Sequence, residues 1–468
     1  MTIKNFKILT LGYSYEVIEN TWDRINDIRD YKIIHVLNPS LFPTKHKPES
    51  TKYIFLFKKP LKNLPKPDLK LLSNLEQNEG PTINNIIMAD DRLKRLPYKE
   101  ALSYLSFAAK RMCKILNLIK PNVLLSGYDG FYSTLFMLIC RKENVPWFAL
   151  TYTPIPKGFV GFSKSNNSFS TFAFGKLSAS YYKILAENTL KEYETNNLKT
   201  FVPISENSFK NVIRFVPLRF KNAFKCLRKE ITGNLDKYSQ RSFIEGLFDY
   251  FRRKSNLLTN YQIEQLKLPP EKPYVFFGFH MQPEMGIDVW APFFANQIQI
   301  IEHIARSVPP THEVLVKLHR IDADNWSSKQ LKFINKILGV RLVSHEADTK
   351  KFLQNADLVF SIQGTIALEA AMMGCEVISF AKTIYEDMLS VDRIKDIEEL
   401  PLLVRKKLQK KKINRNQILL GLTTLLKRFR PGFHNNWKLR PDEKHIEQFC
   451  LHLDDMKKEL KNDVTKFF

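Results

Sequence analysis

The hydrophobic pattern of the chain alternates between short apolar runs and longer stretches with apolar residues at helical spacing. The pattern is clearest at 357–380, DLVFSIQGTIALEAAMMGCEVISF. The apolar run at 358–360 predicts a strand, and the stretch at 366–373, ended by Gly374, predicts a helix. A second apolar run at 377–380 predicts the next strand. Strand, helix and strand in this order are typical of a parallel sheet covered by helices.

The same alternation covers the first part of the chain. Apolar runs and amphipathic stretches predict strands and helices in the order 6–11, 98–119, 123–126, 131–142 and 147–151. Because strands and helices alternate, this region reads as one α/β domain.

A second alternating region follows the proline-rich stretch at 268–273, which predicts a linker. Strands and helices are expected in turn at 274–279, 294–305, 313–318, 326–338, 341–343 and 349–355, ahead of the unit at 357–380. The chain of 468 residues has room for two such domains. We therefore predict an α/β protein with two domains in which strands and helices alternate.

Polar side chains cluster where three strands of the second region end. The clusters are His280, Gln282 and Glu284, then Lys317, His319 and Arg320, then Ser361, Gln363, Gly364 and Thr365. The carboxyl ends of parallel strands meet at one edge of a sheet, where open α/β sheets bind their ligands. Together the three clusters predict a nucleotide site.

The turn at 361–365 comes directly before a predicted helix. Ser361 and Thr365 place hydroxyls where backbone N–H groups lack partners, and Gly364 would let a ligand approach the backbone. A helix start of this kind suits a phosphate, or it is a capped helix without a ligand. Glu369 lies one turn further on the same helix face and can reach the same site.

Asp129 is the candidate acid of the first domain. It follows the strand at 123–126 and is flanked by Gly127 and Gly130, which leave room for a substrate. It is a candidate general base or a helix N-cap. Glu16, after the first strand, is the second candidate.

Composition and charge indicate which kinds of partner the protein binds. The formal net charge of +24 predicts an anionic partner, such as a phosphorylated donor, an acidic glycan or an anionic membrane surface. The five cysteines have no metal-ligand spacing, and we expect no metal and no cofactor. The sequence carries no signature of a nucleic-acid-binding fold, no signal peptide and no apolar run long enough to span a membrane. A cytoplasmic location is expected.

Two segments are both basic and apolar, 209–254 and 404–415. Segment 209–254 is either a helix that lies on anionic lipid at the inner membrane, or helices whose apolar face packs inward while their charges are solvated. Segment 404–415 either lies against anionic lipid or the acidic glycan, or is a solvated helix face. The pair Asp322 and Asp324 has the letters of a metal motif, but its position before a helix indicates a cap.

The second region resembles the capsule polysaccharide biosynthesis family, which includes the β-Kdo transferases of bacterial capsule assembly. The resemblance rests on YVFFGFHMQPE at 274–284, VLVKLHR at 314–320, the stretch at 341–380 and the tyrosine in KTIYEDM at 382–388. The family's Lys-x-His-Pro motif is matched by Lys317 and His319, but Arg320 stands where the family has proline. GYDGFYS at 127–133 and TPIPKGFV at 153–160 are similar more weakly.

This resemblance implies a GT-B fold, in which two Rossmann-like, doubly wound domains face each other across a cleft, and a metal-independent glycosyltransferase activity. The implied parts are an acceptor domain at 1–200, a basic connector at 201–268, a nucleotide-sugar domain at 269–410 and C-terminal helices at 411–468 that cross back to the first domain. The donor would be a nucleotide sugar, for example a CMP-activated acid sugar such as Kdo, and the acceptor a glycan or glycolipid.

The resemblance also suggests roles for the clustered residues. His319 would donate a proton or a hydrogen bond to the leaving phosphate, and Asp129 would activate the acceptor hydroxyl. The remaining residues, His280, Gln282, Glu284, Lys317, Ser361, Gln363, Gly364, Thr365 and Glu369, would bind the donor. His280 is alternatively a structural histidine. A non-catalytic binding protein, a sugar epimerase and a polyol-phosphate transferase remain as alternatives.

Overall fold

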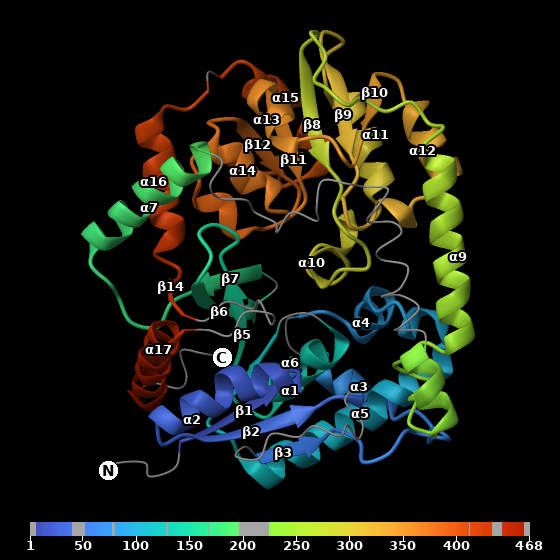
Figure 1. Cartoon of the computed structure of the whole chain (residues 1–468), viewed down its shortest axis with the longest axis vertical. Coiled ribbons are helices and arrows are strands. Elements are labelled where there is room, and N and C mark those ends of the chain that lie inside the picture. Colours follow the sequence, from blue (N-terminus) through green and yellow to red (C-terminus); the bar gives the residue numbers. More distant parts are fainter. Residues whose placement is uncertain are drawn as a thin grey trace. The chain divides into compact units, whose positions relative to one another are not determined.

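The chain folds into two compact units. The computed structural model describes residues 6–39, 52–76, 80–127, 130–166, 168–195, 224–410, 412–432 and 442–462 (Figure 1). The first unit comprises Met1–Tyr181, Phe224–Phe243 and Leu426–Phe468, and the second comprises Tyr182–Ala223 and Ile244–Leu425. Each unit is built around one sheet.

The sheet of the first unit has the order β14-β6-β5-β4-β1-β2-β3, with β7 paired to β6. The strands are β1 (Lys7–Leu11), β2 (Lys32–Leu37), β3 (Lys52–Phe55), β4 (Val123–Ser126), β5 (Trp147–Tyr152), β6 (Phe159–Asn166), β7 (Ser168–Phe172) and β14 (Arg430–Pro431). The ladders among the first five strands are parallel, whereas β6 pairs antiparallel with β5, β7 and β14.

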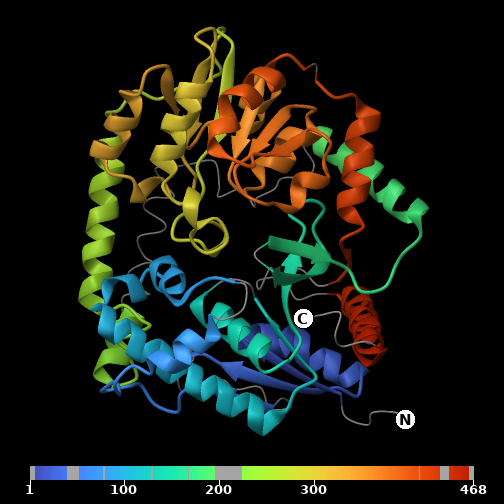
Figure 2. The ribbon, with the colours of Figure 1, turned by 180° about the vertical axis from the view of Figure 1, so that it is seen from behind.

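Helices from both ends of the sequence complete the first unit. They are α1 (Tyr15–Val17), α2 (Arg24–Ile28), α3 (Leu69–Leu75), α4 (Ile83–Ala89), α5 (Tyr98–Ile119), α6 (Phe131–Lys142) and α17 (Glu443–Asn462). Helix α17 lies beside α2 (Figure 2). Its apolar residues, such as Phe449 and Leu453, share one core with Ile8 of β1 and Trp22. The C-terminal helix is therefore part of the first unit's core.

The sheet of the second unit is parallel throughout its described ladders, in the order β10-β9-β8-β11-β12-β13. Its strands are β8 (Tyr274–Gly278), β9 (Glu313–Lys317), β10 (Val340–Val343), β11 (Leu358–Ser361), β12 (Glu376–Ser379) and β13 (Val391–Arg393). The accompanying helices are α7 (Ala179–Glu194), α9 (Phe243–Asn260), α10 (Met285–Asp288), α11 (Gln297–Ser307), α12 (Ser328–Asn335), α13 (Thr349–Asn355), α14 (Ile366–Met372), α15 (Leu400–Leu408) and α16 (Arg415–Leu426).

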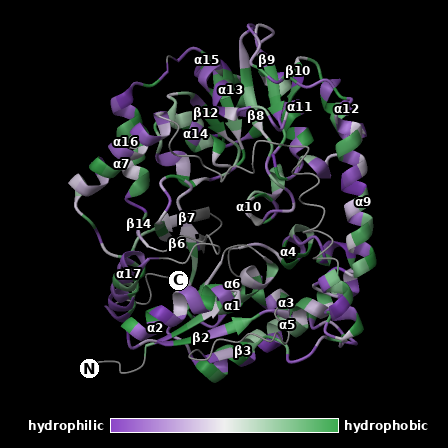
Figure 3. Cartoon of the chain, viewed as in Figure 1, coloured by the Kyte–Doolittle hydropathy of each residue, from purple (hydrophilic) through white to green (hydrophobic). Residues whose placement is uncertain are grey.

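Helices cover both faces of this second sheet because successive strand residues point in opposite directions. Val275 and Phe277 of β8 belong to a core that includes residues of α11, α12 and α15. Tyr274 and Phe276 form ring contacts with Phe352 of α13 on the other face. The strands are accordingly hydrophobic along their length (Figure 3).

The α/β fold class with two mostly parallel sheets is confirmed. Two helices begin later than predicted, since α11 starts at Gln297 and α12 at Ser328. The reason is local: the side chain of Asn296 accepts the N–H of Gln299, and Ser327 forms a capping box with Gln330. Among the described residues, we find no helix with the length and apolarity needed to cross a membrane.

Candidate functional site

The strand order places a topological switch point in the second unit between β8 and β11. From β8 the chain moves to β9 and β10 on one side, whereas β11 on the other side is followed by β12 and β13. The loops after β8 and β11 therefore leave toward opposite faces of the sheet at its carboxyl edge. Open α/β sheets bind ligands at such switch points.

His280 links the loops that follow β8 and β11. Its ring Nε2 accepts the backbone N–H of Gln363 at 3.2 Å, and its main chain exchanges hydrogen bonds of 2.8 and 3.0 Å with the carboxamide of Gln297. Burial, with a smaller contribution from nearby His319, lowers the pKa of His280 to about 3. The ring is therefore neutral, with its proton on Nδ1.

Gly364 makes room for this histidine. A Cβ atom on Gly364 would lie 2.6 Å from Nε2 of His280, closer than a side chain tolerates. The sequence led us to expect that this glycine lets a ligand approach the backbone. In the structure the space beside it holds the His280 ring.

We predict that Gly364→Ala destabilises the second unit. The added methyl would push the His280 ring away and break its bond with Gln363, at a cost of about 1–3 kcal/mol in the free energy of unfolding. Denaturant unfolding measures this change. The variant His280→Ala/Gly364→Ala should recover part of the loss because the clash is gone. Additive losses in the double variant would contradict this account.

Several polar groups of the turn after β11 form hydrogen bonds within the protein. Ser361 Oγ accepts the N–H of Gly364 at 3.0 Å, while the N–H of Gln363 is bonded to His280. The Gln363 side chain donates to the carbonyl of Lys382 at 2.8 Å. Thr365 precedes α14 without a side-chain cap, and within the described parts of the chain its hydroxyl makes no hydrogen bond. Thr365 is thus the residue of this turn best placed for a ligand.

Lys317 lies buried at the end of β9. Its Nζ donates to the carbonyl of His345 at 3.3 Å. Burial and, to a lesser extent, the Arg320 cation lower the pKa of Lys317, the Glu369 carboxylate opposes them, and the result is a pKa of about 8. A partly desolvated cation therefore lies near a carboxylate of α14.

His319 follows two residues later. Its Nδ1 accepts the N–H of Ile321 at 3.4 Å, which leaves the proton of the neutral ring on Nε2. Burial, aided by Lys317, lowers the pKa of His319. At neutral pH this histidine is therefore an uncharged imidazole that carries an N–H donor.

Gln282 shapes the loop after β8. Its Nε2 donates to Asp288 Oδ1 at 2.8 Å and to the carbonyl of Ala295 at 3.0 Å, and its Oε1 accepts from Gln297 at 2.7 Å. Asp288 also accepts the N–H of Glu284 at 2.9 Å. The Gln282 side chain, which we expected to contact a donor, is engaged within the loop.

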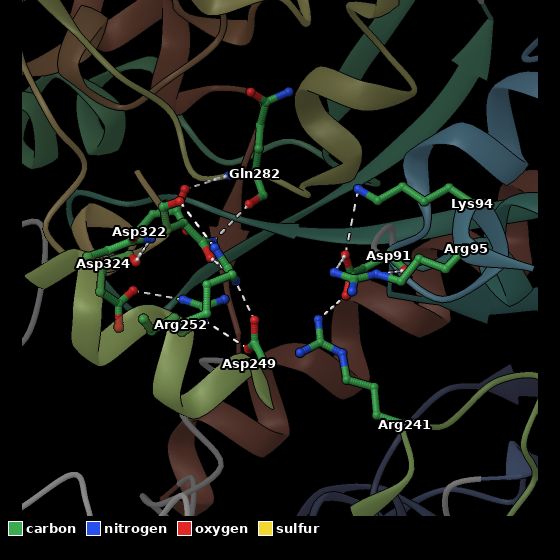
Figure 4. Close-up of polar contacts among 12 residues, drawn as sticks. Asp91, Lys94, Arg95, Arg241, Asp249, Arg252, Gln282, Asp322 and Asp324 are labelled. Carbon is green, nitrogen blue, oxygen red and sulfur yellow. Dashed lines mark hydrogen bonds and ion pairs between the residues drawn. The ribbon is translucent and has the colours of Figure 1, made fainter. Parts of the chain in front are cut away.

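Asp322 and Asp324 bind neighbouring segments. The Asp322 carboxylate accepts the N–H of Gln282 at 3.3 Å, and Asp324 pairs with Arg253 of α9 at 2.8 Å. Figure 4 shows the contacts of Asp322, Asp324 and Gln282. The prediction that Asp322 caps a helix is wrong, because its side chain makes no cap hydrogen bond and instead binds the loop after β8.

Sequence reasoning missed Tyr193 of α7. Burial raises the pKa of Tyr193, and the Glu369 carboxylate adds to this rise. Lys350 of α13 donates to the Tyr193 carbonyl at 2.8 Å and lies 4.8 Å from the centre of its ring. Glu369 and Glu284 also help to raise the pKa of buried Tyr385. Glu369 therefore lies near enough to Lys317, Tyr193 and Tyr385 to shift the pKa of each.

The first unit has its own switch point, between β1 and β4. Gly12 (φ +88°) follows β1, and Gly127 and Gly130 (φ +97°) follow β4; a Cβ on any of the three would meet no heavy atom of the described residues within 4 Å. Asp129 lies outside the described residues. Glu16 is exposed in the short helix α1.

Comparisons with known proteins give similarities of fold. No family model and no curated protein matches the chain. The β-Kdo 2,4 transferase KpsC of Thermosulfurimonas dismutans is similar over 65% of this chain and 79% of that one, with 13% identity and a TM-score of 0.35. A putative UDP-N-acetylglucosamine 2-epimerase of Listeria monocytogenes covers 97% of both chains, with 11% identity and a TM-score of 0.32. The Methanocaldococcus jannaschii UDP-GlcNAc 2-epimerase, solved with UDP-GlcNAc and UDP, covers 90% of this chain and 98% of that one, with 11% identity and a TM-score of 0.31.

Proposed function

We propose that this protein is a metal-independent GT-B glycosyltransferase of capsule or other surface polysaccharide biosynthesis. In this proposal, a sugar passes from a nucleotide donor to a glycan or glycolipid acceptor, with a CMP-activated acid sugar such as Kdo as the donor we would test first. The observation that carries the proposal is that Lys317 at the end of β9, His319 two residues later and Glu369 of α14 lie close enough for Lys317 to lower the pKa of His319 and for Glu369 to raise that of Lys317.

Donor cleavage leaves a negative charge on the departing phosphate. A buried cation and a preorganised N–H donor can stabilise that charge, and both act more strongly away from bulk water. Lys317 would supply the charge, and Nε2 of His319 would supply the hydrogen bond. Thr365 would add its hydroxyl and N–H from the neighbouring loop.

The carboxylate of Glu369 gives the site a second kind of contact. A carboxylate accepts hydrogen bonds from vicinal hydroxyls, as ribose or a sugar would present them. Its opposite charge also holds Lys317 protonated against the effect of burial. We propose that Glu369 binds the ribose or the sugar while Lys317 binds the phosphate. The proposed base for the acceptor hydroxyl is Asp129 of the first unit.

A panel of nucleotide sugars tests the proposal. The purified full chain should release the nucleotide from one donor, slowly with water and faster with an acceptor. Interconversion of the sugar without nucleotide release would point to an epimerase, and binding without turnover would point to a binding protein. Either result would overturn the proposed transfer.

We expect buried Lys317 to lower the free energy of unfolding, and we propose that this residue is present because it binds the ligand. Because burial lowers its pKa to about 8, the unfolded chain holds this proton more tightly than the folded protein. The cost is fully present below about pH 8 and fades as the pH rises toward the lysine's ordinary pKa of about 10.5. We expect Lys317→Met to raise the free energy of unfolding at pH 7 by about 1–3 kcal/mol.

Denaturant unfolding at pH 7 and at higher pH measures this gain. Lys329→Met is the matched control, because Lys329 is exposed on α12 and carries no burial cost. It should leave stability nearly unchanged. A loss of stability in Lys317→Met at pH 7 would mean that Lys317 is held by stronger contacts than we infer.

A further inference from the structure

Helix α9 is attached to the second unit through polar side chains. Arg253 pairs with Asp324 at 2.8 Å, Asn256 donates to the Asp324 carbonyl at 3.0 Å, and Asn260 donates to the Trp326 carbonyl at 2.8 Å. These three α9 residues are spaced by three and four positions and so share one face of the helix. Asn260 is the buried residue of α9.

The opposite face of α9 is apolar and exposed. Ile244, Phe248, Phe251 and Leu258 are 63%, 72%, 61% and 66% exposed. Their spacing of four, three and seven positions places them in one row, which we call the α9 stripe. At about 100° per residue this row lies on the far side of the helix from Arg253 and Asn256.

This orientation is the reverse of the usual one. A helix on a globular protein normally buries its apolar face and exposes its polar face. The structure thus contradicts, for α9, the alternative in which the apolar face packs inward. A row of large exposed apolar side chains marks a surface that meets another apolar phase.

Charge decides between the partners that could cover the α9 stripe. A second copy of this chain would bring together two molecules of formal net charge +24, which repel each other. Helix α12 begins two residues after Trp326, where α9 is attached; Lys329 and Lys332 on this helix and Lys336 at its C-cap are exposed, with no acidic residue between them. Exposed lysines beside an apolar helix face fit an anionic lipid surface, with lysine ammonium groups at the phosphates and apolar side chains at the acyl boundary.

We propose that the α9 stripe, with the lysines of α12, is a docking surface for an anionic lipid bilayer. The helix lies in the interface, the phenylalanines enter the acyl boundary, and the polar face stays bound to the second unit. Attachment is peripheral and depends on salt, since the electrostatic part of the binding is screened. The proposal does not depend on which donor the protein uses.

Co-sedimentation of the full chain with vesicles tests this surface. Wild-type protein should bind phosphatidylcholine vesicles that contain phosphatidylglycerol, bind pure phosphatidylcholine weakly, and dissociate as salt rises. Phe248→Ser/Phe251→Ser should lower the partition coefficient by about tenfold or more. Lys329→Gln/Lys332→Gln/Lys336→Gln should weaken binding to the anionic vesicles and reduce its salt dependence.

The matched control is Leu118→Ser, which changes a residue 75% exposed on α5 of the first unit. It should bind vesicles like the wild type, and circular dichroism should show all variants folded. Unchanged vesicle binding by the phenylalanine double variant would overturn the proposal. So would a dimer in sedimentation velocity that disappears in that variant, because the stripe would then be covered by a second copy.

Discussion

Replacing His319 with alanine is expected to lower turnover of the donor by about two to four orders of magnitude. The imidazole is held by the N–H of Ile321 at 3.4 Å, so that its Nε2–H can be directed at the leaving phosphate. The substitution should leave the fold intact, because His319 is only half-buried beyond the end of β9. Steady-state kinetics with thermal unfolding as a control measures both effects.

A second variant distinguishes two roles of His319: a charged ring that donates a proton, and a neutral ring that donates a hydrogen bond. Burial lowers the pKa of His319, so the charged form of the ring is lost at a lower pH than for an ordinary histidine. A neutral donor instead keeps its function as the pH rises through 7 and 8. His319→Gln, which places an N–H near the position of Nε2, should therefore recover part of the activity. Near wild-type transfer by His319→Ala would remove the residue from the mechanism.

Asp129→Asn is expected to reduce transfer by about two to four orders of magnitude while nucleotide affinity stays unchanged. The substitution keeps the shape of the side chain and removes the base. The flanking glycines, Gly127 and Gly130, follow β4 at the first unit's switch point, where added side-chain atoms would meet open space. An acceptor could approach there, whereas the donor is assigned to the second unit.

Parallel assays of transfer and of nucleotide binding check this prediction. Glu16→Gln is the control, since Glu16 is exposed on α1 after the neighbouring strand. It should transfer sugar like the wild type. Normal transfer by Asp129→Asn, or weaker nucleotide binding, would show that Asp129 is not the base.

The sheet edge was predictable because its signals are local. Each buried strand is a short apolar run, and the polar residues that follow it in sequence also follow it in space, as His319 and Thr365 do. The partner of each residue at this edge was less predictable. Gln282 is engaged by Asp288 and Gln297, and Gly364 by His280, which lies 84 positions earlier in the sequence. A partner that is distant in the sequence cannot be recognised from the local pattern of residues.

Two further features depend on tertiary contacts that the sequence does not display. Tyr193 of α7 is placed near the site by a tertiary contact, in which Lys350 of α13 donates a hydrogen bond to the Tyr193 carbonyl. Helix α9 has an amphipathic pattern, but periodicity does not say which face turns inward. Its orientation is set by Arg253 and Asn260, whose partners lie in the segment before α12. The arrangement of the two units across a cleft stays a prediction.

Equilibrium binding of CMP, CDP, UDP and GDP to the wild type and to Lys317→Met tests the central claim most directly. The account predicts that the wild type prefers one nucleotide and that Lys317→Met binds it at least about tenfold more weakly while being no less stable. The loss should shrink in high salt, as expected for a contact between a cation and a phosphate. If the variant binds that nucleotide as tightly as the wild type, or if the wild type binds none of the four, the switch point of the second unit is not a nucleotide site.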